Sequence, residues 1–261
     1  MSRVVLTLLD GLRPDALSPE RTPNLLRAAA NGAHTLAARS VMPSITLPCH
    51  FSIFHSVPPQ RHGILSNSYA PMARPVIGLF DAANDAGKVC GSLYNWEELR
   101  DLSKPGSLHY SFHSRSSYDI EAGDRIIADQ AVPLIAQGAF DLLFVYLGTI
   151  DTAGHLYGWM SDGYLDQVRQ VDGEVGRLLD ALPADTAMIL HADHGGHDRN
   201  HGTESPEDMT IPWIITGGGV RAGHRIQRPV SLIDTAPTIA RILSFSPPRD
   251  WEGAPVEEAL L

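Results

Sequence analysis

Cysteine is scarce in this sequence. Only Cys49 and Cys90 occur among 261 residues, which excludes a disulfide framework as the source of stability. Long apolar runs are also missing, and no stretch approaches the roughly 20 residues that a membrane-spanning helix needs. The short run at residues 4–9 ends at Asp10 without a small-residue cleavage site, so it indicates a buried strand rather than a signal segment. We therefore expect a cytoplasmic protein with no membrane partner.

Basic residues are in deficit as well. The chain has 20 Lys and Arg against 30 Asp and Glu, and its formal charge is -10. This balance excludes a general nucleic-acid-binding surface, because such surfaces depend on an excess of Lys and Arg. No linker or repeat marks a boundary, so we predict one domain over residues 1–261. The least regular stretch, residues 95–117, is expected to form a cap or loop over a site; the oligomeric state is left open.

Short apolar runs alternate with longer amphipathic segments, as in an α/β protein with a mostly parallel central sheet and helices on both faces. The runs are nearly continuous, as expected of strands covered on both sides. Predicted strands are residues 3–9, 88–93, 140–147, 186–191 and 211–216. Predicted helices are residues 23–31, with Thr22 as N-cap and Pro23 at the first helical position, and 78–86, 119–137, 161–182 and 236–243.

Polar side chains follow these strands at the ends where α/β sheets bind ligands. These side chains are aspartates and histidines, which are the ligands expected in a catalytic zinc site. Taken singly, an aspartate after a strand is more often a turn former, so the clustering carries the inference. Spacing adds that Asp151 and His155 share one face of a helical turn, while His191 and His197 remain open as alternatives. The candidates are Asp10, Asp151, His155, Asp193, His194 and His201.

A further candidate is Thr46, which precedes Pro48 near the predicted start of a helix. One interpretation is that its hydroxyl only caps the helix. The other is that the hydroxyl faces an anion at the helix N-terminus and acts as a nucleophile beside a metal ion. Taken alone, the position of Thr46 favours capping.

In order and spacing, these segments resemble the alkaline phosphatase superfamily, most closely its nucleotide pyrophosphatase/phosphodiesterase branch. The resemblance extends from Leu8-Leu9-Asp10-Gly11 to Asp234-Thr235-Ala236-Pro237-Thr238 and includes the Thr46 segment and His62-Gly63-Ile64 with Asn67. It implies an alkaline-phosphatase-like fold and one catalytic domain. It also implies two divalent cations, zinc first, with manganese or iron as alternatives.

Carried over by position, the resemblance makes Thr46 the covalent nucleophile. It implies that one metal is held by Asp10, Thr46, Asp193 and His194, and the other by Asp151, His155 and His201. Asn67 and Cys49 are implied as substrate-binding positions, although many diesterase relatives have asparagine where this chain has Cys49. A sulfatase is set aside because Cys49 is followed by His50-Phe51-Ser52-Ile53 rather than a Cys-x-Pro-x-Arg motif.

The implied activity is hydrolysis of a small phosphorus ester, foremost a phosphodiester, through a phospho-threonine. Two alternatives from the same superfamily stay open: a phosphonoacetate-hydrolase-like C–P hydrolase and a phosphomonoesterase. An alternative of another class is a metal-binding protein without turnover.

Overall fold

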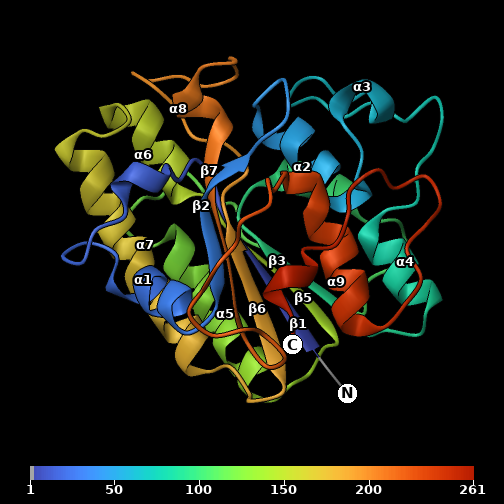
Figure 1. Ribbon diagram of the computed structural model, residues 1–261. Coiled ribbons are helices and arrows are strands. Elements are labelled where there is room, and N and C mark those ends of the chain that lie inside the picture. Colours follow the sequence, from blue (N-terminus) through green and yellow to red (C-terminus); the bar gives the residue numbers. More distant parts are fainter. Residues whose placement is uncertain (1–2) are drawn as a thin grey trace.

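The computed structural model describes residues 3–261. An eight-stranded sheet crosses the described chain in the order β4-β3-β5-β1-β6-β7-β2-β8 (Figure 1). Only β7 runs against its neighbours; the other pairings are parallel. This confirms the predicted mostly parallel α/β sheet. The strands are β1 (Arg3–Leu9), β2 (Ala33–Arg39), β3 (Cys90–Tyr94), β4 (Tyr110–His113), β5 (Leu142–Leu147), β6 (Thr186–His191), β7 (Thr210–Gly217) and β8 (His224–Arg225).

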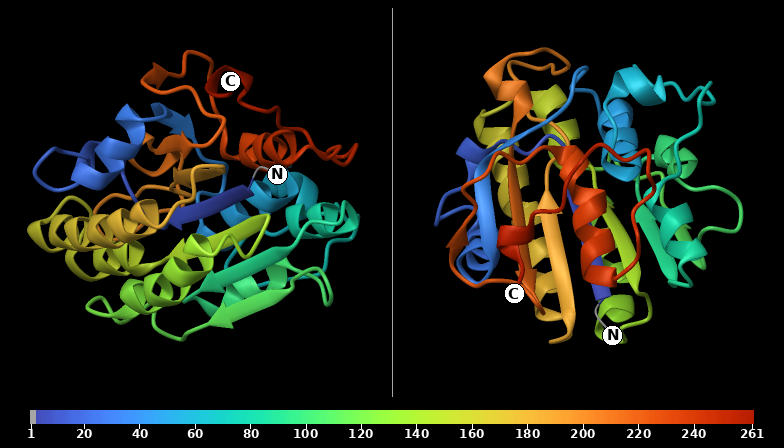
Figure 2. Two further views of the ribbon diagram at one scale, coloured as in Figure 1. Left: turned by 90° about the horizontal axis from the view of Figure 1, so that it is seen from below. Right: turned by 45° about the vertical axis from the view of Figure 1, so that its right-hand side comes forward.

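Helices cover both faces of the sheet, as predicted (Figures 1 and 2). One face carries α1 (Pro23–Ala30), α5 (Gly123–Ala136), α6 (Thr149–Tyr157) and α7 (Asp162–Asp180). The other carries α2 (Thr46–His55), α4 (Leu79–Asp85) and α9 (Thr235–Leu243). Two short helices, α3 (Pro59–His62) and α8 (Pro206–Met209), lie near the upper edge of the sheet in Figure 1. No helix within residues 3–261 is long and apolar enough to cross a membrane.

The start of one helix and the cap of another differ from the sequence prediction. Helix α5 begins at Gly123 rather than 119, because the Asp119 carboxylate accepts bonds from the N–H groups of Glu121 and Ala122 and holds a turn there. Helix α1 begins at Pro23 as expected, but the Thr22 hydroxyl donates to the Ser18 carbonyl instead of capping the helix. The Asp172 carboxylate of α7 accepts from the N–H groups of the first turn instead.

The irregular stretch at residues 95–117 contains short ordered elements. A 3-10 helix, η2 (Glu97–Leu102), is followed by β4, which pairs with β3 as the sheet edge. Strands β2, β4 and β8 were not predicted. Strands β4 and β8 are short, and all three carry exposed or half-buried residues, so they lack the continuous apolar pattern that marks the central strands.

The central strands end level with one another. Leu9 of β1 is in register with Leu147 of β5, and Leu8 pairs with His191 of β6. All three strands are buried along almost their whole length. The residues that follow them therefore emerge together at one edge of the sheet, which positions the candidate site.

Candidate two-metal site

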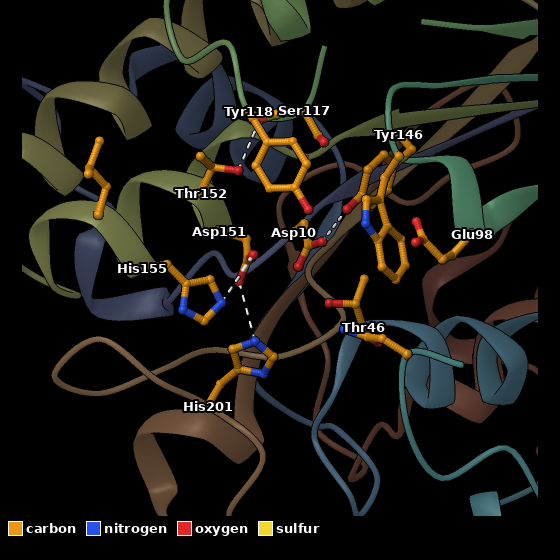
Figure 3. A pocket seen from close by; sticks show the side chains of 14 residues that line it. Asp10, Thr46, Glu98, Ser117, Tyr118, Tyr146, Asp151, Thr152, His155 and His201 are labelled. Carbon is orange, nitrogen blue, oxygen red and sulfur yellow. Dashed lines mark hydrogen bonds and ion pairs between the residues drawn. The ribbon is translucent and has the colours of Figure 1, made fainter. Parts of the chain in front are cut away.

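A cavity of about 620 Å³ opens at this edge of the sheet. It lies between the N-terminus of α2, helix α6 and the residues next to η2 and β4, and Figure 3 shows it from close by. Its lining residues are Asp10, Thr46, Asn67, Trp96, Glu98, Ser117, Tyr118, Tyr146, Gly148, Asp151, Thr152, His155, Leu156 and His201.

The structure brings all the predicted metal-ligand positions together. Two groups have ligand atoms that all lie within 4.8 Å of one another: Asp151, His155 and His201 in one group, and Asp10, Asp151 and His194 in the other. Nε2 of His194 also lies 3.4 Å from Oδ2 of Asp193, which places Asp193 beside the second group. Asp151 thus lies between two positions that can each hold a cation.

The three histidines are oriented by the backbone. Nδ1 of His155, His194 and His201 donates to the carbonyls of Arg199, Gly195 and Ser44, respectively, each at 2.8 Å. Fixing the proton on Nδ1 leaves the lone pair of Nε2 free to face the site, which is how metal-binding imidazoles are commonly held. The three rings are therefore held with Nε2 directed at the site.

Three carboxylates converge on the same place. Within residues 3–261, one buried oxygen of each of Asp10, Asp151 and Asp193 has no hydrogen-bond partner. Burial raises the pKa of all three carboxyls, that of Asp193 to about 7, and their mutual repulsion adds to the effect at Asp10 and Asp193. Converging carboxylates without counter-charges fit divalent cations, which supply the missing charge and ligation. The donor set thus suits divalent cations, and the assignment of individual ligands stays a prediction.

Thr46 opens helix α2 but does not cap it. The residue in the N-cap position is Ile45, and the helix has no side-chain cap hydrogen bond. The Thr46 hydroxyl oxygen instead lies 3.2 Å from Nε2 of His194, and it borders the cavity. The capping interpretation therefore does not account for this hydroxyl, which is directed at the second ligand group.

The two predicted substrate positions differ in placement. Asn67 lines the cavity, and its Oδ1 accepts a hydrogen bond from the Leu47 N–H at 3.0 Å, which leaves the amide NH₂ as its available donor. The structure does not bring Cys49 to the cavity. Its thiol is fully buried against the Ser40 hydroxyl, and burial raises its pKa well above the usual range. Cys49 occupies the next turn of α2 and faces inward.

Two aromatic residues that the sequence prediction missed support the ligands. The Tyr146 hydroxyl, at the end of β5, donates to Oδ2 of Asp10 (Figure 3). The Trp159 indole N–H donates to the Gly11 carbonyl at 2.9 Å, and the ring packs against His155. Tyr146 was in principle detectable as the one hydroxyl in an apolar strand. No local pattern points to Trp159.

His191 and His197, which the sequence left open as metal ligands, both lie away from the two ligand groups. His191 is buried in the core, its Nε2 lies 3.2 Å from the Thr235 hydroxyl, and burial lowers its pKa to about 4. Nδ1 of His197 lies 2.7 Å from Asp208. Asp208 also accepts bonds from the backbone and hydroxyl of Thr203, so it ties the His197 turn to the loop that carries His201. Neither alternative belongs to the ligand groups.

The family follows from comparison with known sequences. The sequence model described as "Type I phosphodiesterase / nucleotide pyrophosphatase" matches residues 4–100 and 91–209, which hold the described ligand groups and Thr46. The chain belongs to this family. The resemblance noted from the motifs, to the nucleotide pyrophosphatase/phosphodiesterase branch of the alkaline phosphatase superfamily, is thereby confirmed.

Curated relatives of this type I phosphodiesterase family member are larger proteins. Rat ectonucleotide pyrophosphatase/phosphodiesterase family member 7 is 25% identical over 224 residues, which are 74% of this chain and 49% of the relative. GPI ethanolamine phosphate transferase 3 of Eremothecium gossypii is 31% identical over 133 residues, 46% of this chain and 13% of that protein. The chain thus spans about half or less of their length.

Solved structures confirm the fold of the family member. An inactive form of murine ectonucleotide pyrophosphatase/phosphodiesterase 5 in complex with AMP superposes with a TM-score of 0.83 at 16% identity, covering 100% of both chains. The phosphonate monoester hydrolase of Silicibacter pomeroyi superposes with a TM-score of 0.76 at 17% identity, covering 98% of this chain and 76% of that one. At these identities the likeness concerns the fold alone.

Proposed function

We propose that this chain hydrolyses small-molecule phosphodiesters, with Thr46 as covalent nucleophile and two divalent cations as cofactors. The observation that carries the proposal is the hydroxyl of Thr46, which makes no capping bond and lies 3.2 Å from His194 beside converging, uncompensated carboxylates. A hydroxyl in this position does not cap the helix and suits attack on phosphorus.

In this proposal Asp151, His155 and His201 hold one cation. Asp10, Asp193 and His194, with the hydroxyl of Thr46, hold the other. Zinc is the expected metal because the set combines imidazole and carboxylate, and manganese and iron are the alternatives. When bound, the two cations stabilise negative charge on the attacking and leaving oxygens.

The residues of the chain then perform two displacements. Thr46 Oγ1 gives up its proton to solvent and bonds to phosphorus as the bond to the departing alkoxide breaks; the alkoxide leaves with the electron pair and takes a proton from solvent. Water next attacks the phospho-threonine, its oxygen staying on phosphorus, and the bond between phosphorus and Thr46 Oγ1 breaks as a proton of that water restores the hydroxyl. Asn67 holds a phosphoryl oxygen through its NH₂ group, because the Leu47 N–H already occupies its carbonyl.

The lining of the cavity favours diesters over monoesters. No Lys or Arg borders it within residues 3–261, so a second negative charge on the phosphoryl group meets no cationic side chain. The same deficit opposes phosphonoacetate, which brings a carboxylate. Retention of every ligand position speaks against a metal-binding protein without turnover.

The test is a comparison of substrates on one zinc-loaded preparation whose metal content has been measured. We expect kcat/KM for bis-p-nitrophenyl phosphate to exceed that for p-nitrophenyl phosphate, and phosphonoacetate to release no acetate. A higher kcat/KM for the monoester assigns the chain as a phosphomonoesterase instead. Acetate release assigns a C–P hydrolase, and full metal occupancy without any turnover leaves only metal binding.

A further inference from the structure

We infer that Asp124 positions Asp151, the carboxylate that lies between the two ligand groups, by holding the first turn of α6. Asp124 does not line the cavity, so it acts on the site through this helix. The inference rests on the metal centre of the proposed function, because it concerns how the chain presents one of the ligands.

Asp151 depends on its helix for its position. Within residues 3–261, one of its oxygens has no hydrogen-bond partner, and the other lies 3.5 Å from Nε2 of His155. By contrast, Asp10 accepts a hydrogen bond from Tyr146, and Asp193 accepts from two backbone N–H groups. Asp151 is the third residue of α6, so the backbone of the first turn determines where its carboxylate lies.

This first turn is anchored by a side chain from another helix. The N-cap residue of α6 is Gly148, which has no side chain to accept from the free N–H groups. Oδ1 of Asp124, on α5, accepts from the N–H groups of Gly148 and Thr149 at 2.9 and 3.3 Å. Its Oδ2 accepts from the Thr149 hydroxyl at 2.6 Å. Asp151 follows two residues later, so a shift of this turn would move its carboxylate.

The same carboxylate is joined to α6 by a second route. The Asn95 amide donates to Oδ1 of Asp124 at 2.8 Å, and the Asn95 carbonyl accepts from the Ser117 N–H at 3.2 Å. The Ser117 carbonyl accepts from the Thr152 hydroxyl of α6 at 2.9 Å (Figure 3). Two chains of hydrogen bonds, one direct and one through Asn95 and Ser117, therefore connect Asp124 to the helix that carries Asp151.

Asp124 is a costly group to keep for stability alone. Its carboxylate is buried and, within residues 3–261, forms no ion pair. Burial raises its pKa to about 6, so ionisation at neutral pH weakens the fold. A buried charge of this kind is expected where function rather than stability retains it.

The experiment measures zinc affinity by competition with a chromogenic chelator at about pH 8, where Asp124 is ionised. Asp124→Ala should weaken zinc binding about tenfold, as for residues that orient a metal ligand. Asp124→Asn should lose less, because its amide keeps one acceptor oxygen for the Gly148 N–H. Thr149→Val removes only the hydroxyl that donates to Asp124, and it should weaken zinc binding severalfold.

Asp172→Ala is the matched control. Asp172 is also a buried carboxylate that caps a helix from a distant element, because it accepts from the N–H groups of Asn24 and Leu25 in α1. Helix α1 carries no candidate ligand. The variant should therefore be less stable in urea, while its zinc affinity stays within about twofold of wild type.

Two outcomes overturn the inference. Wild-type zinc affinity in Asp124→Ala, or in Thr149→Val should the alanine variant not fold, means that the turn holds Asp151 without Asp124. An equal loss of affinity in Asp124→Ala and Asp172→Ala means that general destabilisation is the cause.

Turnover of bis-p-nitrophenyl phosphate by the same wild-type samples tests the proposed function separately. A wild type that binds zinc and hydrolyses no ester removes the proposed function, while the zinc affinities of the variants still decide the role of Asp124. A wild type that binds no zinc removes both.

Discussion

The hydroxyl of Tyr146 donates a hydrogen bond to Oδ2 of Asp10, and the other oxygen of that carboxylate lies 3.3 Å from Nε2 of His194. Tyr146 thereby fixes which oxygen of Asp10 faces the second ligand group. Burial raises the pKa of Tyr146 well above its usual range, so the phenol keeps its proton and remains a donor under assay conditions.

Tyr146→Phe should weaken binding of the metal at the second group by about 10- to 100-fold, the effect typical of removing a residue that orients a ligand. Zinc affinity measured by competition with a chromogenic chelator checks this. Tyr157→Phe is the matched control: Tyr157 is 42% exposed and does not line the cavity. Equal affinities in both variants would mean that Asp10 is held without Tyr146.

Thr46→Ala should abolish turnover of bis-p-nitrophenyl phosphate while the protein keeps most of its metal, because the aspartates and histidines remain. Thr46→Ser should retain measurable activity, since the reaction needs the hydroxyl and not the methyl group. Steady-state rates and metal analysis of the same samples provide the comparison. Wild-type rates in Thr46→Ala would show that water attacks phosphorus directly.

Gly196→Ala should displace the turn that follows His194. A Cβ at Gly196 would lie 2.3 Å from the Trp159 indole, whereas one at Gly173, within α7, meets nothing within 4 Å. We expect the Gly196 variant to lose about 1–3 kcal/mol of stability and to bind zinc less tightly. Gly173→Ala should be neutral or stabilising by up to about 1 kcal/mol, because alanine favours the helix. Urea unfolding and zinc titration measure both effects.

Asp124 should make stability depend on pH. Its carboxylate accepts bonds from Asn95, Gly148 and Thr149, but burial dominates and raises its pKa to about 6. The folded state therefore holds this proton more tightly than the unfolded chain, in which the pKa of an aspartate is about 3.9. Protonated Asp124 therefore adds to the free energy of unfolding. This stabilisation is complete below about pH 4 and is lost as the pH rises through about 6, a change of about 3 kcal/mol.

The measurement compares the free energy of unfolding of wild type and Asp124→Asn in urea from pH 4 to pH 7. The stability advantage of the wild type should shrink across this range, because only the wild type carries the titrating group. Asp166→Asn, at a surface pair with Arg169, should keep a constant difference from wild type. A constant difference for Asp124→Asn as well would refute the assignment.

The sequence by itself determined the central sheet and the position of the site. The apolar runs of β1, β5 and β6 admit only buried strands, and strands that run parallel end at one edge. The ends of these strands are followed within a few residues by Asp10, by Asp151 with His155, and by Asp193. The local pattern was therefore enough to predict that these side chains lie together. The spacing of Asp151 and His155 likewise places both on one turn of α6.

Only the tertiary structure decided which distant side chains cap the helices and support the site. The first turn of α1 is capped by Asp172 of α7, whose two oxygens accept from the N–H groups of Asn24 and Leu25 at 3.0 and 2.9 Å, so the threonine expected to cap it does not. Two further hydrogen bonds form in the same way. The Tyr146 hydroxyl donates to the Asp10 carboxylate, and the Ser117 N–H donates to the Asn95 carbonyl. Each pair is distant in sequence, and its formation depends on the packing of whole elements, which short-range residue patterns do not encode.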